Sequence, residues 1–382
     1  MDQVITEKTG EKPRDIAGRI LLAPLDWGLG HATRCIPIAR ELINKGCEPW
    51  FACDGSQQVL LQAEFPQLNF LPLAGYRVRY AKTAPGLLWQ MIRQSPRLLQ
   101  VIKKEHEWLK QAVDRYGFKA VISDNRYGLH HPSVPSIFIT HQLTIKSPLG
   151  RWSESLLRKK NYGYINRFNE CWVPDAEGND NLAGELSHPG QLPHTRVRYI
   201  GPLSRFEKKN IDERKDHLLF ILSGPEPQRS ILENKIIHDV TAYGGTATIV
   251  RGLPGYESLI PSTNMIRFYN HLPADALNKE IAQADYVISR SGYSTVMDLA
   301  VMNKKSILIP TPGQTEQEYL GKYLVEKKLA YCVSQREFVL DDALEKAQQS
   351  GYRFSGSVNT TLHDAIASLL TDQAAITHAP KL

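Results

Sequence analysis

The sequence predicts an α/β protein made of two doubly wound parallel-sheet domains that face a cleft. Short apolar runs typical of buried strands alternate with segments of helical apolar spacing along most of the 382 residues. A chain of this length exceeds one core of usual size, which favours two domains. Each half also begins with a strand that leads through a polar or glycine-bearing loop into a helix.

The predicted strands are separated by helical patterns, which indicates parallel sheets with helices on both faces. In the first half they span residues 18–24, 48–53, 68–73, 118–123, 135–140 and 170–174. In the second half they span residues 217–224, 246–252, 265–270, 285–290 and 306–311. The series is interrupted at residues 198–216, where Gly201 and Pro202 precede a charged stretch. We therefore expect an N-terminal domain over 18–200 and a C-terminal domain over 201–382, with the last helix packing back on the first domain.

The cysteines and the N-terminus favour a cytoplasmic protein. The first 15 residues are polar and charged, unlike a signal peptide, and no apolar run reaches the length of a membrane span. Neither a zinc site nor a disulfide framework is indicated, because the five cysteines are scattered without a C-x-x-C pair. They are Cys35, Cys47, Cys53, Cys171 and Cys332.

The net charge of +6 is unevenly distributed. Residues 76–119 carry ten Lys/Arg against three Asp/Glu, and residues 145–168 carry six against one. In the first stretch these charges flank apolar residues at near-helical spacing: Leu87, Leu88, Trp89, Met91, Ile92, Leu98, Leu99, Val101, Ile102 and Leu109. Such a surface either lies on an anionic membrane, here the inner face of the plasma membrane, or is the solvated face of a core-facing helix. Nucleic acid is not an expected partner, because no reader motif is present.

The segment "LDWGLGHATR", residues 25–34, joins the first strand to the first helix through glycines. Gly28 and Gly30 at such a corner let a backbone approach a ligand closely, and the first amides of the helix point outward unpaired. The same glycines also serve turn geometry alone. His31 is correspondingly either a group that acts on a ligand or a hydrogen-bonded residue at the helix start.

The most specific segment is residues 285–324. A strand ends at Ser289 and Arg290, and residues 291–295 lead into a helix that contains Asp298. Hydroxyls, a glycine and free amides at a helix start form an anion site suited to a pyrophosphate. The alternative is that Ser294 or Thr295 only caps the helix and that Asp298 complements its dipole.

This segment resembles the corresponding segment of a known group of enzymes. Arg290-Ser291-Gly292, then Thr295-Val296 and Asp298, then "SILIPTPGQTEQEYLGKYL" are similar to the nucleotide-binding half of family-28 glycosyltransferases of the two-domain GT-B architecture. That group includes the peptidoglycan N-acetylglucosaminyltransferase that forms lipid II. "GLGHATR" is similar to the group's N-terminal glycine-rich loop, which faces the donor across the cleft. The resemblance implies two Rossmann-like domains and a nucleotide-sugar donor, most simply a UDP-sugar.

The resemblance assigns donor-binding residues by position. Asp298 would hold the ribose, while the backbone near Phe268 and Tyr269 would recognise the base. Gln317 and Glu318 would face the donor sugar. Ser291, Gly292, Ser294 and Thr295 would hold the pyrophosphate, and Gly28 and Gly30 would let their loop close over it. Ser223, Gly224 and Arg290 complete the expected donor-binding residues. Asp298 stands where the lipid II enzyme has the longer Glu, which shortens its reach to the ribose. Glu318 stands where that enzyme has Gln, so N-acetylglucosamine itself is not implied.

The acceptor side is expected at the ends of two strands of the first domain, at Asp124 and at Thr140, His141 and Gln142. Asp124 could equally be a helix cap, and His141 a loop residue bonded to backbone. In the resemblance, displacement at the anomeric carbon is a single inverting step with His31, Asp124 or His141 as catalytic groups. No Asp-x-Asp motif is present, so we expect no metal and no cofactor besides the donor.

The expected function is therefore inverting sugar transfer to a hydroxyl acceptor, for which a lipid-linked or cell-envelope glycan is a candidate. A hydrolase or 2-epimerase of nucleotide sugars on the same fold is the alternative. A third interpretation is a non-catalytic nucleotide-sugar binder.

Overall fold

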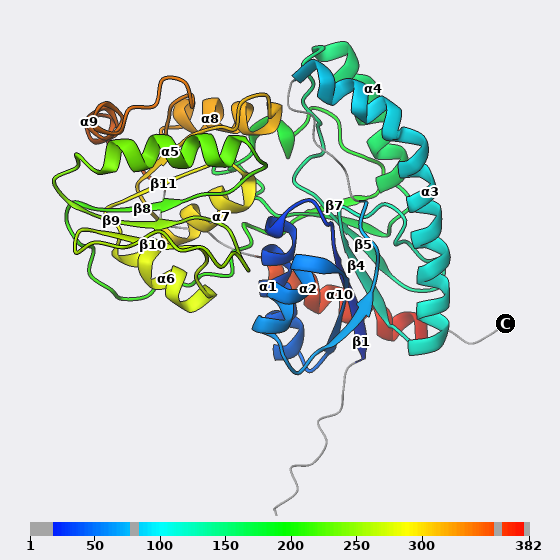
Figure 1. Cartoon of the computed structure of the whole chain (residues 1–382). Helices are drawn as coiled ribbons and strands as arrows, with labels where there is room; N and C mark the ends of the chain where they lie inside the picture. The colour runs from blue at the N-terminus through cyan, green and yellow to red at the C-terminus, as the bar shows by residue number, and fades with distance from the viewer. Residues whose placement is uncertain (1–17, 77–83, 355–360, 378–382) are drawn as a thin grey trace, which may run out of the picture.

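The computed structural model describes residues 18–76, 84–354 and 361–377, with only the backbone described for 84–97 and 372–377. It contains one parallel sheet in each half of the chain (Figure 1). The prediction of two parallel-sheet α/β domains is confirmed. The expected boundary near Gly201 falls between the last strand of the first sheet and the first strand of the second.

The first sheet has the strand order β3-β2-β1-β4-β5-β6-β7. Its strands are β1 (Arg19–Pro24), β2 (Glu48–Cys53), β3 (Asn69–Pro72), β4 (Ala120–Asp124), β5 (Ser136–Ile139), β6 (Glu170–Val173) and β7 (Arg196–Tyr199). Its helices are α1 (Leu29–Asn44), α2 (Gly55–Glu64), α3 (Ala84–Tyr116) and α4 (Arg151–Ile165). The sequence did not predict β7, whose four residues are charged or only partly buried at the sheet edge.

The second sheet has the order β10-β9-β8-β11-β12-β13. Its strands are β8 (His217–Ile221), β9 (Thr246–Val250), β10 (Ile266–Tyr269), β11 (Tyr286–Ser289), β12 (Ser306–Leu308) and β13 (Tyr331–Cys332). Its helices are α5 (Gln228–Val240), α6 (Ala274–Gln283), α7 (Tyr293–Met302), α8 (Thr315–Glu326) and α9 (Leu340–Ser350). The two-residue edge strand β13 was also not predicted.

Both sheets reverse their strand order next to their first strand. In the first sheet β1 pairs with β2 on one side and β4 on the other. In the second, β8 pairs with β9 and with β11. Ligands of open parallel sheets bind beyond the carboxyl ends of the strands at such a reversal. The loops after β1, β4, β8 and β11 are therefore where a site is expected.

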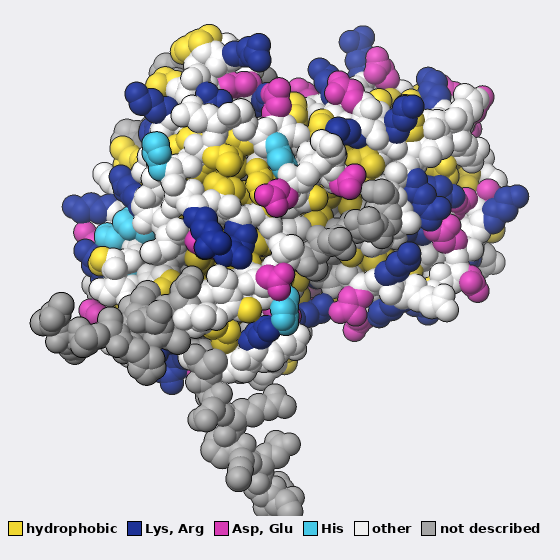
Figure 2. Space-filling model, turned by 180° about the vertical axis from the view of Figure 1, so that it is seen from behind, with side chains coloured by type: hydrophobic (Ala, Val, Ile, Leu, Met, Phe, Trp, Pro, Cys, Tyr) yellow, Lys and Arg dark blue, Asp and Glu magenta, His cyan; other side chains and the backbone are white. Residues whose placement is uncertain are grey.

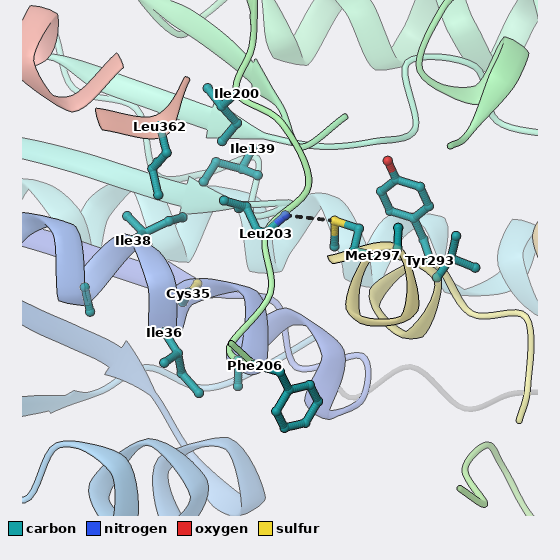
Figure 3. Close-up of a cluster of buried hydrophobic side chains, with 14 of the residues drawn as sticks. Cys35, Ile36, Ile38, Ile139, Ile200, Leu203, Phe206, Tyr293, Met297 and Leu362 are labelled. Carbon is teal, nitrogen blue, oxygen red and sulfur yellow. Dashed lines mark hydrogen bonds between the residues drawn. The ribbon is translucent and has the colours of Figure 1, made fainter. Parts of the chain in front are cut away.

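The last helix, α10 (Leu362–Thr377), returns to the first domain and lies beside α1 (Figure 1). Just before it, Thr361 donates from its backbone N–H to Ile200 O (3.2 Å) and from its hydroxyl to Tyr199 O (2.7 Å). The segment after β7 packs between the domains, where the Leu203 N–H points to Met297 Sδ at 3.3 Å (Figure 3). Residues of both domains thus share one apolar core.

The basic amphipathic stretch predicted at 76–119 forms much of α3. The side chains of Leu87, Leu88, Trp89, Met91 and Ile92 lie outside the described residues. In the described half of α3, Ile102 and Leu109 are buried in the core, whereas Leu99 is exposed. Within the described chain, no helix combines the length and apolar character needed to cross a bilayer.

Candidate active site

The two glycine-bearing loops meet where α1 and α7 begin. Ser294, in the first turn of α7, donates its hydroxyl hydrogen bond to Gly30 O across the domain boundary (3.2 Å). A Cβ on Gly30 would lie 2.6 Å from Ser294 Oγ, so only glycine fits without displacement. Gly28 has a φ of 84° at the N-terminus of α1 with nothing near its missing Cβ. Gly30 therefore serves close approach, and Gly28 serves backbone geometry.

His31 lies in the first turn of α1 and is held by the end of β4. Its Nδ1 lies 3.0 Å from Asp124 Oδ2. Asp124 is fully buried and also accepts from Arg34 through both Nε (2.7 Å) and Nη2. Its pKa is raised by burial, but the Arg34 guanidinium and the His31 ring outweigh that effect and lower it. Asp124 is therefore an ionised acceptor.

The ionised Asp124 favours the His31 tautomer that carries its proton on Nδ1. In that tautomer the lone pair lies on Nε2, which has no hydrogen bond to the described residues. Burial lowers the pKa of His31, and Asp124 partly offsets this. An imidazole that is neutral near pH 7 and has a free Nε2 is suited to accept a proton.

His141 is placed differently, although it follows the neighbouring strand β5. Its Nε2 lies 2.8 Å from Glu316 Oε1, and its Nδ1 lies 3.3 Å from Arg34 Nη1. Its ring stacks on Tyr293 with centroids 4.3 Å apart and planes at 11°. Gln142 also donates to Glu316. Both ring nitrogens of His141 are therefore occupied, Nε2 by Glu316 of the second domain and Nδ1 by Arg34 of the first.

The expected pyrophosphate site is the start of α7. Gly292 precedes the helix, and a Cβ there would meet only Gln317 Nε2, at 4.0 Å. Ser291 is buried and donates to Gln317 O (2.9 Å), so its hydroxyl holds α8 against this loop. Ser294 and Thr295 are partly exposed in the first turn. Free amides and two hydroxyls thus lie at one helix start, opposite Gly30.

Asp298 lies farther along α7 and faces the segment between the domains. Its Oδ1 accepts from Ser204 Oγ at 2.5 Å. Burial raises the pKa of Asp298 to about 7, although the Ser204 hydrogen bond and the Arg205 charge act in the opposite direction. Asp298 therefore changes charge near neutral pH.

Gln317 and Glu318 support the loop after β12. Gln317 Oε1 accepts from the Thr311 N–H (2.9 Å), and Glu318 Oε1 accepts from the Gly313 N–H (3.0 Å). Both side chains lie in the first turn of α8 and carry oxygens at the carboxyl end of β12. The expected sugar-facing pair is thus next to the α7 start.

The remaining predicted donor residues lie around the same sheet end. Ser223 and Gly224 are exposed after β8, where Gly224 has a φ of 103° and lies near Thr311. Tyr269 ends β10, and its carbonyl accepts from the Arg251 N–H. Arg290 is buried and donates to the carbonyls of Ile309, Pro310 and Gln228 and to Gln335 Oε1. These contacts hold the surrounding loops together.

The known proteins most relevant to this site are glycosyltransferases. The glycosyltransferase family 28 C-terminal domain matches residues 263–365, which include β11, α7 and α8. A Methanosarcina acetivorans protein named as an uncharacterized glycosyltransferase is 22% identical over 89% of this chain and 95% of its own. The Haemophilus ducreyi UDP-N-acetylglucosamine–N-acetylmuramyl-(pentapeptide) pyrophosphoryl-undecaprenol N-acetylglucosamine transferase is 25% identical over 84% of this chain and 86% of its own. The chain is a glycosyltransferase, and part of its second domain matches family 28.

Solved structures confirm the GT-B fold of this glycosyltransferase. Acinetobacter baumannii MurG aligns over 93% of this chain and 99% of its own, with a TM-score of 0.56 and 12% identity. The kitacinnamycin glycotransferase aligns over 94% and 95%, with a TM-score of 0.60 and 14% identity. At such identities these two structures establish the fold alone.

Sequence reasoning missed three residues that organise this site. Arg34, Glu316 and Tyr293 were not among the expected site residues. The GHATR motif contains Arg34, and its position three residues after His31 was a usable signal. Glu316 and Tyr293 gave no such signal, because their partners belong to the other domain.

Proposed function

We propose that this glycosyltransferase moves a sugar, with inversion, from a UDP-linked donor to a hydroxyl acceptor without a metal. The observation that carries the proposal is the pairing of His31 with the ionised Asp124, directly across the Gly30–Ser294 contact from the start of α7. The proposed base and the proposed anion site then lie on opposite domains, on either side of this contact.

In the proposed step, His31 Nε2 takes the proton of the acceptor hydroxyl as its oxygen forms a bond to the anomeric carbon. The bond from that carbon to the diphosphate breaks on the opposite side, which inverts the configuration. The departing diphosphate gains negative charge, which the free amides of the α7 start and the Thr295 hydroxyl stabilise. Ser294 would donate there only by releasing Gly30 O. In the described part of the chain, no group of three His, Cys, Asp or Glu is arranged to hold a metal ion.

The experiment is product analysis with a panel of nucleotide sugars, offered with and without hydroxyl acceptors in EDTA. We expect transfer to an acceptor, with a product whose anomeric configuration by NMR is opposite to that of the donor. Release of free sugar without any transfer would support the hydrolase instead, and binding without turnover would support the binder. Retained configuration would contradict the proposed step.

The proposed acceptor is lipid-linked, at the cytoplasmic face of a membrane. The Haemophilus ducreyi relative carries an undecaprenol acceptor in its name. Support from this chain comes from α4, which exposes Trp152 (68%) and Leu156 (64%) on a helix that also carries Arg151, Lys159 and Lys160. Hydrophobic side chains and Lys/Arg lie side by side at the upper end of the molecule in Figure 2. Exposed aromatic and basic groups together favour an anionic lipid surface.

Vesicle sedimentation tests this part of the proposal. We expect the protein to bind vesicles that contain phosphatidylglycerol and not pure phosphatidylcholine vesicles. The double variant Trp152→Ser/Leu156→Ser should lose this binding while soluble-acceptor activity stays unchanged. Equal binding of the variant and the wild type would exclude this surface as the membrane contact.

A further inference from the structure

A continuous chain of side chains joins the C-terminal domain to the proposed base. It runs from Glu316 on α8 to His141 (2.8 Å), from His141 to Arg34 (3.3 Å), and from Arg34 to Asp124 (2.7 Å). From Asp124 it reaches His31 (3.0 Å). Only Glu316 comes from the second domain.

The donors and acceptors in this row of side chains follow from the chemistry of Glu316 and Arg34. Glu316 is a carboxylate, so His141 donates from Nε2 and its Nδ1 is left as an acceptor. Arg34 has only donors, so its Nη1 donates to that Nδ1 while its Nε and Nη2 donate to Asp124. Asp124 is left to accept from His31 Nδ1. The four contacts given above then each join a donor to an acceptor, with the His31 lone pair on Nε2.

Arg34 can also bond to His31 in a way that takes the lone pair away from Nε2. Its Nη2 lies 2.7 Å from His31 Nδ1, and a hydrogen bond donated there would leave the His31 proton on Nε2. The bond from Nη1 to His141 holds the other side of the guanidinium, which keeps it on Asp124. Glu316 fixes the His141 tautomer that makes this bond, and α8 is the helix that supplies Glu316.

The charges of the network agree with this arrangement. Asp124 and Glu316 are two carboxylates against the single guanidinium of Arg34, so the network carries one negative charge while both histidines are neutral. One proton taken up by His31 then balances the network. Burial raises the pKa of Glu316, but His141, His31 and Arg34 outweigh that effect and lower it, so Glu316 stays ionised.

We propose that Glu316 is a positioning residue that orients and strengthens the His31 base from the opposite domain. The proposal rests on the proposed function of His31. If the proposal holds, the orientation of His31 depends on the contact of α8 with the first domain. The same helix holds the loop after β12 through Gln317 and Glu318, so donor contacts and base orientation share one element.

NMR of ¹⁵N-labelled histidine tests the proposal without any substrate. The titratable and charged groups around His31 are Arg34 on its own helix, Asp124 on β4, His141 after β5 and Glu316 on α8. We expect wild-type His31 to be protonated on Nδ1 when neutral. Glu316→Gln keeps an acceptor for His141 but removes the charge, so the His31 pKa should fall by 0.5 or more. Glu316→Asp keeps the charge and should recover at least half of that shift.

Kinetics provide the second measurement. Glu316→Gln should lower kcat about tenfold and move the acidic limb of the pH profile to lower pH, with the donor KM changed less than twofold. The matched control is Glu326→Gln, because Glu326 is an exposed carboxylate at the other end of α8. This variant should leave kcat and the pH profile unchanged. An unaltered His31 pKa and tautomer in folded Glu316→Gln overturns the inference. A wild type that transfers no sugar overturns the proposed function instead, while the NMR result still stands.

Discussion

His31 and His141 follow neighbouring strand ends, yet their hydrogen bonds separate them chemically. His31 has a carboxylate on Nδ1 and, among the described residues, no hydrogen-bond partner on Nε2, whereas His141 is bonded at both nitrogens and stacked on Tyr293. A general base needs an accessible lone pair within reach of the proton it removes. The sequence named both histidines, but only their bonds distinguish them.

The first prediction concerns His31. His31→Ala should lower turnover by about a hundredfold or more, as loss of a positioned base does, while nucleotide affinity changes little because its expected contacts lie in the other domain. Steady-state kinetics and calorimetric nucleotide binding check this, with the exposed His194→Ala as the control. Nearly full turnover in His31→Ala would leave "GLGHATR" as a binding loop only.

The second prediction uses the pKa of Asp298, which burial raises to about 7. If an ionised Asp298 accepts from the ribose hydroxyls, protonation weakens binding, so affinity falls as pH falls below 7. The apparent Kd for a UDP-sugar should therefore be about tenfold higher at pH 6 than at pH 8. Calorimetry at both pH values measures it, and Asp298→Asn should flatten the dependence. A wild type with no pH dependence would place Asp298 outside the ribose site.

At the level of elements, the sequence predicted the strands that are buried on both faces. The eleven apolar runs correspond to β1 to β6 and β8 to β12, because central parallel strands are covered on both faces. The edge strands β7 and β13 were not predicted. Strand β7 contains two arginines and is only partly buried, and strand β13 has two residues. The glycine loop was predicted from its letters. Its contact with Ser294 was not predicted, because Gly30 and Ser294 are 264 positions apart in the sequence.

The third prediction tests that contact. Gly30→Ala should place a Cβ 2.6 Å from Ser294 Oγ and separate the starts of α1 and α7, which lowers kcat/KM. Ser294→Gly removes the obstructing atoms, so the alanine should cost little more in that background. A double-mutant cycle in kcat/KM should show a coupling of about 1 kcal/mol or more. Additive effects would mean that the two loops act independently.

At the scale of the molecule, the site is assembled from distant parts of the chain. His31, Arg34, Asp124, His141 and Glu316 come from four elements or loops and two domains. Local periodicity indicates strands and helices, and motifs indicate loops, but neither states which loops face each other. The sequence therefore predicted the two halves of the site separately. Their union depends on how the shared core around Leu203 and Met297 sets one domain against the other.

The fourth prediction follows from this union of two domains. UDP should stabilise the protein in EDTA, because the α7 start and its hydroxyls supply the anion site that a metal supplies elsewhere. At a hundred times its Kd, a ligand contributes about 2.7 kcal/mol, which for a cooperative chain of this size is roughly 3 °C in Tm. Thermal unfolding with UDP, ADP and no nucleotide measures the shift. A Tm shift with ADP but not with UDP would contradict a uridine site. Loss of the UDP shift in EDTA would contradict a metal-free site. If UDP stabilises Asp298→Ala as well as the wild type, the nucleotide binds without the ribose contact.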